Sequence, residues 1–186
     1  MIESRIQCGV GVAIASNVDI FGNGRLILDD YVVIEPNVLV DLGTSFEGCI
    51  TIRSRAKIKT GVVLRCYAGR IDIGHRVTLG EYGVWLGHGG ISVGAQCIVA
   101  SHCSVTAAQH LHKSDVPIRH QGETAHGVRI GSGVWMGAGV RILDGVSVGN
   151  DTIIGAGAVV TRTMPANSIC HGIPCRAVKP RWTRGA

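Results

Sequence analysis

The sequence predicts an all-β protein, a parallel β-helix in which short strands coil into a stack of about seven turns. Apolar residues recur every six positions over most of the chain. Glycine is unusually frequent, at 27 of 186 residues, and aromatic residues make up only 4%. The hydrophobic fraction is nevertheless 46%, so the chain can bury a core and is not a disordered glycine-rich tract.

The first run of repeats begins at Leu28. Every sixth residue from there is apolar: Leu28, Ile34, Val40, Phe46, Ile52, Ile58 and Leu64. The residue four places after each of these is small or β-branched, from Val32 to Ala68. Ile14 and Ile20 extend the pattern toward the start of the chain.

A second run has the same spacing and comprises Ile130, Met136, Ile142, Val148, Ile154 and Val160. Between the two runs the period continues with slips, through Ile73, Leu79, Trp85, Val93, Val99 and Val105.

A period of six fits neither an α-helix nor the alternation of an antiparallel strand. Each unit can form one strand and one turn, and three units close a triangular coil of about 18 residues. Two unbroken runs argue against a β-sandwich. We therefore predict a β-helix domain over residues 1–163.

The period stops after Val105 and returns at Ile130. We predict an extruded loop over residues 106–129, and long loops in compact repeats are usually functional. This loop holds four of the eight histidines: His110, His112, His120 and His126. Histidine can accept a hydroxyl proton near neutral pH, which acyl transfer to an alcohol requires. On the residues alone, His110 and His112 are equal candidates, and His88 and His102 are further ones.

The C-terminal end carries the whole excess of positive charge. The net charge is +5, and no Asp or Glu follows Asp151. The basic residues beyond it are Arg162, Arg176, Lys179, Arg181 and Arg184. Without these five, the 18 lysines and arginines would fall to 13, equal to the acidic residues. We predict a basic C-terminal extension over residues 164–186 that meets a phosphate-bearing partner.

The chain begins without an apolar signal segment and has no run of about 20 apolar residues that could span a membrane. Its seven cysteines form no C-x-x-C pair, which indicates free thiols in a reducing compartment. We therefore expect a cytoplasmic protein. We expect no nucleic-acid partner.

Several motifs follow the start of the loop in a fixed order. They are Gln109-His110, Pro117-Ile118-Arg119-His120-Gln121-Gly122, Val134-Trp135-Met136-Gly137, Gly155 to Thr161, and Gly172-Ile173-Pro174-Cys175-Arg176. On these motifs, His110 to Lys179 resembles the hexapeptide-repeat O-acetyltransferases. That family includes the galactoside, maltose and nodulation-factor enzymes, and the polysaccharide-cluster sugar O-acetyltransferases have the most similar pattern. Gln109 departs from the pattern, which has Asn more often.

The resemblance implies a left-handed coil, a homotrimer with active sites between subunits, and a direct acetyl transfer from acetyl-coenzyme A to a sugar hydroxyl. It implies that His110 is the catalytic base. It also places a cofactor contact at seven positions: Trp135, Ala138, Ala156, Thr161, Arg162, Arg176 and Lys179. No metal is expected.

The acceptor site is harder to identify. Glu81 and Tyr82 should lie one coil before the loop, and with His112 they are candidates for binding the acceptor. The resemblance implies a sugar or glycan precursor of cell-envelope or exopolysaccharide biosynthesis. Such sugars are often lipid-linked, and the basic end could make a peripheral membrane contact.

Three other functions remain open. An N-acetyltransferase acting on an amino sugar, or on a nucleotide-linked amino sugar, would use the same coil. A γ-carbonic-anhydrase-like metal hydratase would need three histidines at defined positions. His75 and His102 are on the coil, but Ala107 stands where another histidine is needed. A non-catalytic scaffold is the third.

Overall fold

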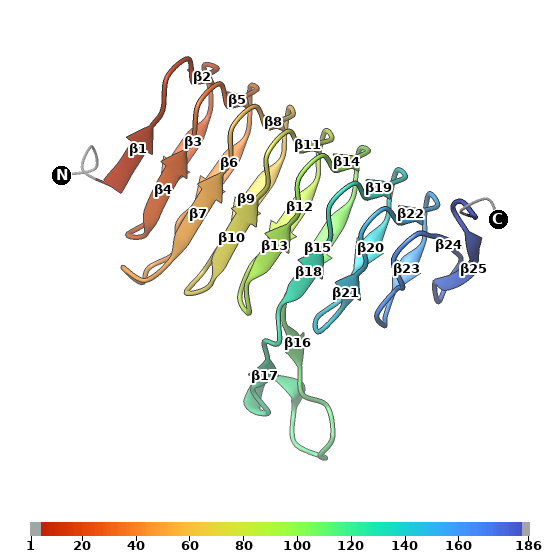
Figure 1. Cartoon of the computed structure of the whole chain (residues 1–186). Helices are drawn as coiled ribbons and strands as arrows, with labels where there is room; N and C mark the ends of the chain where they lie inside the picture. Colours follow the sequence, from red (N-terminus) through yellow and green to blue (C-terminus); the bar gives the residue numbers. More distant parts are fainter. Residues whose placement is uncertain (1–4, 184–186) are drawn as a thin grey trace.

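A computed structural model describes residues 5–183, which form a left-handed parallel β-helix of seven coils (Figure 1). The coils stack so that β1 and β25 lie at opposite ends of the molecule. This architecture confirms the predicted fold class. Arg184, counted above with the basic residues, lies outside the described part.

Three parallel sheets form the sides of the stack. The first sheet contains β1 (Ile6–Cys8), β4 (Arg25–Leu28), β7 (Cys49–Ile52), β10 (Arg70–Ile73), β13 (Ile91–Val93), β18 (Val128–Ile130) and β21 (Ser147–Val148). The second contains β2 (Ala13–Ile14), β5 (Val33–Ile34), β8 (Lys57–Ile58), β11 (Thr78–Leu79), β14 (Ile98–Val99), β19 (Trp135–Met136), β22 (Ile153–Ile154), β24 (Ser168–His171) and β25 (Arg176–Pro180). The third contains β3 (Asp19–Phe21), β6 (Leu39–Asp41), β9 (Val63–Arg65), β12 (Val84–Leu86), β15 (Ser104–Thr106), β20 (Arg141–Ile142) and β23 (Val159–Val160).

The six-residue period places one apolar side chain of each strand inside the stack. Leu28 pairs with Ile52, and Ile52 pairs with Ile73, so equivalent positions of successive coils lie in one buried row. Residues four places on, such as Val32 and Ala56, are also fully buried. Burying these rows in one continuous core stabilises coils that could not fold singly.

One member of the first run does not follow the prediction. Phe46 is 69% exposed, in the corner between β6 and β7. Because Leu28 pairs with Ile52, the coil that joins them holds more residues than three repeats supply. The extra residues bulge outward at the corner and carry Phe46 away from the core.

The C-terminal segment continues the second sheet before it turns back. β24 pairs in parallel with β22, and β25 then pairs antiparallel with β24. Together they cover the end of the stack. Within residues 5–183, no helix has the length and apolar character to cross a bilayer.

The loop leaves the stack where the third sheet turns into the first, between β15 and β18 (Figure 1). It contains a two-stranded antiparallel hairpin of β16 (Gln109–His110) and β17 (Glu123–Thr124), with a 3-10 helix at Ile118–His120. It projects away from the body of the stack.

Candidate functional site

The stem of the loop is an antiparallel hairpin. Gln109 pairs with Thr124, and His110 pairs with Glu123. The Leu111 amide donates to the Gly122 carbonyl at 3.0 Å, which extends the pairing by one step. The hairpin therefore holds His110 at a defined position outside the coil.

The tip of the loop is held by one side chain. Gln121 accepts a hydrogen bond from the Ser114 amide at 3.2 Å. Its amide nitrogen donates to the carbonyl oxygens of Ser114, at 3.2 Å, and Val116, at 2.6 Å. These bonds satisfy backbone groups that a loop otherwise leaves to water. They give a defined shape to the tip, which contains the 3-10 helix Ile118–His120.

The base of the loop rests on Asp144, a residue of the next coil. Its carboxylate accepts from the amides of His126, at 3.1 Å, and Gly127, at 2.9 Å, and from the Thr124 hydroxyl at 3.4 Å. Charge-assisted hydrogen bonds of this kind are the stronger ones. Asp144 thus fixes the point at which the hairpin leaves the stack.

A cavity of about 220 Å³ opens between the hairpin and this anchor. Its polar lining includes His110, His112, Lys113, Thr124, His126 and Asp144. His112 Nδ1 lies 3.3 Å from the carbonyl oxygen of His110. The imidazole of His110 is exposed and makes no hydrogen bond to any residue between 5 and 183. We call this space the His110 cavity; its open imidazole can accept a proton from a bound hydroxyl.

Three of the predicted cofactor positions, Trp135, Ala138 and Ala156, lie elsewhere, at or just before the corner between the second and third sheets. Ala138 and Ala156 lie on adjacent coils there, and the Gly157 amide donates to the Ala138 carbonyl at 2.8 Å. Trp135 is 51% exposed on β19, just before this corner. A side chain at Gly137 would collide with the backbone of Ala156, so the coils meet closely here.

The remaining cofactor positions are divided between two corners of the stack. The Val159 amide donates to the Gly172 carbonyl at 3.1 Å, and the Val159 carbonyl accepts from the Cys175 amide at 2.8 Å. This pairing brings Arg176, the next residue, beside β23. Lys179 lies on β25. Thr161 and Arg162 follow β23 and precede Met164, which bridges to Val148 of the first sheet, so they lie at the corner between the third and first sheets, where the loop also leaves the stack. All four of these side chains are exposed and open to an anionic ligand.

Glu81 and Tyr82 lie one coil before the loop, as expected, but at the corner between the second and third sheets. The Glu81 carbonyl accepts from the His102 amide at 2.8 Å, and the Tyr82 ring stacks on His102 with 5.4 Å between centroids. Neither residue lines the His110 cavity of the same chain. One chain therefore does not bring these acceptor candidates to His110.

The remaining candidate histidine, His88, stacks on Tyr67 with ring centroids 3.5 Å apart. Its Nδ1 is buried and has no hydrogen-bond partner within the described chain. Among residues 5–183, no group of three or more His, Cys, Asp or Glu side chains is arranged to hold a metal ion.

Sequence reasoning missed Asp144 and gave no role to His126. The position of Asp144 could have been found from the repeat, because a loop that leaves the stack at one corner lies next to the equivalent corner of the following coil. Asp144 occupies that corner, between β20 and β21. An acidic residue there can accept the amides that the departing chain leaves unpaired.

Comparison with known proteins agrees with the fold and the repeat. Residues 127–162 match the family described as bacterial transferase hexapeptide (six repeats). Over 133 residues the chain is 30% identical to the putative colanic acid biosynthesis acetyltransferase WcaF of Escherichia coli, covering 68% of this chain and 70% of that protein. Matches to acetyltransferases of Mycobacterium tuberculosis, described as probable, and Saccharomyces cerevisiae, described as putative, cover 40% and 35% of those proteins.

Two solved structures are similar over nearly the whole chain. The polySia-specific acetyltransferase NeuO has a TM-score of 0.67 and 25% identity, covering 97% of this chain and 88% of NeuO. AntD, an N-acyltransferase from Bacillus cereus solved with coenzyme A and an amino-sugar nucleotide, has a TM-score of 0.66 and 19% identity. That match covers 98% of this chain and 88% of AntD, and it is a likeness of fold.

Proposed function

The chain belongs to the hexapeptide-repeat acetyltransferase family, and on that premise we propose that it transfers an acetyl group from acetyl-coenzyme A to a hydroxyl of a sugar or glycan precursor. The observation that carries the proposal is the His110 cavity. A hairpin anchored on Asp144 holds an open imidazole beside a space large enough for part of a sugar.

The transfer needs one proton acceptor. His110 takes the proton of the acceptor hydroxyl as its oxygen attacks the carbonyl carbon of the thioester. The carbon–oxygen bond forms, the carbon–sulfur bond then breaks, and the proton passes from His110 to the departing thiolate. A thioester is already activated, so no covalent enzyme intermediate is required. The hairpin contributes by holding the imidazole in place.

We assign the coenzyme to the corner between the second and third sheets. Arg176 and Lys179 would hold its phosphates, and the charge excess at this end supports that role. Thr161 and Arg162 would contact the coenzyme from the adjacent corner, between the third and first sheets. Trp135, Ala138 and Ala156 would line the pantetheine arm. Coenzyme A is bound by AntD, whose fold is similar.

The active form we propose is a homotrimer. In one chain the His110 cavity lies at a different corner of the stack from Trp135, Ala138 and Ala156, which supports a site completed by a second copy. Two exposed apolar side chains support such an interface, since Ile98 is 59% exposed and pairs with Trp135 on the next strand. The neighbour could also bring Glu81 or Tyr82 to the acceptor. Light scattering on the purified protein tests the trimer.

The acceptor we propose belongs to cell-envelope or exopolysaccharide biosynthesis in the cytoplasm. The similarity to WcaF, named for colanic acid biosynthesis, supports this assignment. A lipid-linked acceptor would place the protein at the membrane surface, where the basic C-terminal end could make a peripheral contact. Vesicle co-sedimentation with and without anionic lipid tests this contact.

The first experiment is calorimetric titration of the protein with acetyl-coenzyme A, and with dephospho-coenzyme A for comparison. We expect saturable binding that weakens for the dephospho form, because Arg176 and Lys179 lose a phosphate partner. Absence of binding by folded protein would contradict the proposal. Sugar and amino-sugar acceptors are then compared, which separates O-acetylation from N-acetylation.

Substitution of the base comes next. We expect His110→Ala to lower kcat by at least about a hundredfold, the usual contribution of a general base, while acetyl-coenzyme A still binds. His112→Ala is the matched control, because it removes an imidazole from the same cavity. An equal loss in both variants would contradict the assignment to His110.

A further inference from the structure

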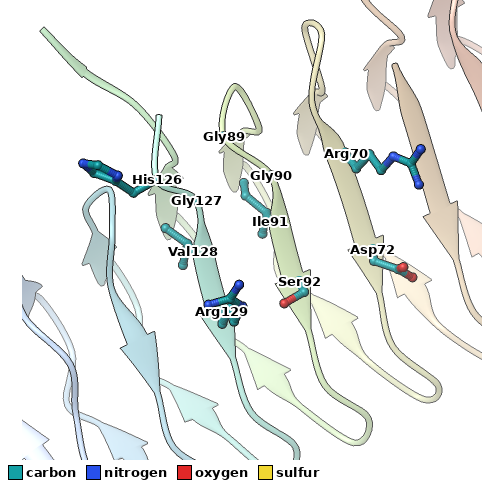
Figure 2. A pocket seen from close by; sticks show the side chains of 10 residues that line it. All are labelled: Arg70, Asp72, Gly89, Gly90, Ile91, Ser92, His126, Gly127, Val128 and Arg129. Atoms are coloured by element: carbon teal, nitrogen blue, oxygen red, sulfur yellow. The ribbon is translucent and has the colours of Figure 1, made fainter. Parts of the chain in front are cut away.

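A second hollow lies on the outer face of the first sheet, beside the base of the loop (Figure 2). Its volume is about 240 Å³. Arg70 and Asp72 of β10 border one side and Arg129 of β18 borders the other, with His126 at the end nearest the loop. We call it the sheet groove.

The strand register explains why the surface is hollow here. Asp72 pairs with Ser92, and Ser92 pairs with Arg129, so these three side chains lie in one row across adjacent strands. Two residues earlier on each strand, the corresponding positions are Arg70, Gly90 and Gly127. Two glycines and a serine therefore form the floor between longer side chains. Adjacent strands are about 5 Å apart, so two spacings, about 10 Å, separate β10 from β18, and a sugar ring fits between their side chains.

The charge of the groove is positive. Asp72 is already engaged, since its carboxylate accepts from Arg53 Nε at 3.3 Å. Arg70 and Arg129 form no ion pair and no side-chain hydrogen bond with any residue from 5 to 183. Both guanidinium groups are exposed. Two uncompensated arginines that border a shared hollow favour a carboxylate or a phosphate, which they can bind through paired hydrogen bonds.

The groove adjoins the His110 cavity. His126 lines both hollows, and Thr124 and Asp144 continue from it toward His110. A single acceptor molecule can therefore place an anionic group between the arginines and a hydroxyl beside the imidazole. This juxtaposition gives the groove a place in the reaction.

We propose that the sheet groove is an acceptor subsite for an anionic group, so that the substrate is an acidic glycan or a phosphate-bearing sugar. The proposal rests on the function proposed above, because it deepens the same site. Arg70 and Arg129 bind the anionic group, and Ser92 leaves room for the ring that carries it. Both arginines are specificity-determining residues that hold the acceptor and take no part in the proton transfer.

The test is direct binding, without catalysis. A hexasaccharide that contains glucuronic acid is titrated calorimetrically, beside the same hexasaccharide with its carboxyl groups reduced to alcohols. Glucose 1-phosphate is the second anionic probe, with glucose as its neutral partner. We expect one anionic probe to bind at least about tenfold more tightly than its neutral partner, and the probe that does so identifies the source of the anion.

Four variants locate the binding. We expect Arg70→Gln and Arg129→Gln each to weaken it about tenfold, the loss of one charge-assisted contact. Arg25→Gln removes an exposed arginine from β4 of the same sheet, outside the groove, and should leave the affinity unchanged. Ser92→Leu fills the floor without a change of charge and should weaken binding as much as the arginine variants do.

Failure of this inference can be told apart from failure of the proposed function. Equal binding of anionic and neutral probes, or equal affinities in Arg25→Gln and the groove variants, would overturn the subsite. Acetyl-coenzyme A is titrated into the same proteins, and we expect the groove variants to bind it as the wild type does. If the wild type binds acetyl-coenzyme A but binds anionic and neutral probes equally, the subsite alone is rejected. If the protein binds anions in the groove but does not bind acetyl-coenzyme A, the proposed acetyltransferase activity is rejected and the anion subsite is retained.

Discussion

At the scale of single residues, Asp144 positions the hairpin that carries His110. Three donors converge on its carboxylate at the loop base. We expect Asp144→Ala to raise the amide exchange rates of His126 and Gly127 by at least about tenfold, because their hydrogen bonds to a charged acceptor are lost. Amides in the first coils should keep their rates. Glu47→Ala removes an exposed carboxylate far from the loop and serves as the control in the same hydrogen-exchange measurement. Unchanged exchange at the loop base would contradict the anchoring role.

At the scale of one coil, the corner between β6 and β7 shows how closely neighbouring turns meet. Gly43 has a φ of +73°, and a Cβ there would collide with the Tyr67 carbonyl of the next coil. Gly157 has nearly the same φ, +69°, but open space around it. We expect Gly157→Ala to lower the free energy of unfolding by about 1–2 kcal/mol through backbone strain alone. Gly43→Ala should cost about 1–3 kcal/mol more, because it also overpacks the corner. Urea unfolding of both variants measures the difference, and equal losses would refute the steric explanation.

At the scale of the whole molecule, the stack encloses most of the thiols. Of the seven cysteines, six are buried and Cys8 is exposed. Burial raises the pKa of Cys66 and of Cys175 to about 11, so neither thiol ionises appreciably near neutral pH. We expect a thiol reagent at pH 8 to label one cysteine per folded chain and all seven in guanidinium, since the thiolate is the reactive form. Cys8→Ser should abolish labelling of the folded protein. Rapid labelling of several thiols without denaturant would show that the coils open readily.

Much of the fold follows from local pattern. Each six-residue unit forms one strand and one turn, so the same position of every unit points into the stack. The spacing by itself therefore assigns Ile34, Ile58 and Leu79 to the core, and all three are buried there. The interruption of the period located the loop, and its composition made His110 and His112 equal candidates for a base. The resemblance to the hexapeptide-repeat O-acetyltransferases then favoured His110. The roles of His110 and of the coenzyme residues remain predictions that the experiments above test.

The repeat, the core rows, the loop and the basic end were thus determined by the sequence alone, because each depends on residues close together in the chain. Only the tertiary structure decided which residues meet across coils. Phe46 left the core, Asp144 came beneath the hairpin, and Arg70 of β10 and Arg129 of β18 came to border one hollow. The physical reason lies in the corners. Their lengths differ from coil to coil, and the register between strands is set only when the backbone hydrogen bonds of stacked coils form.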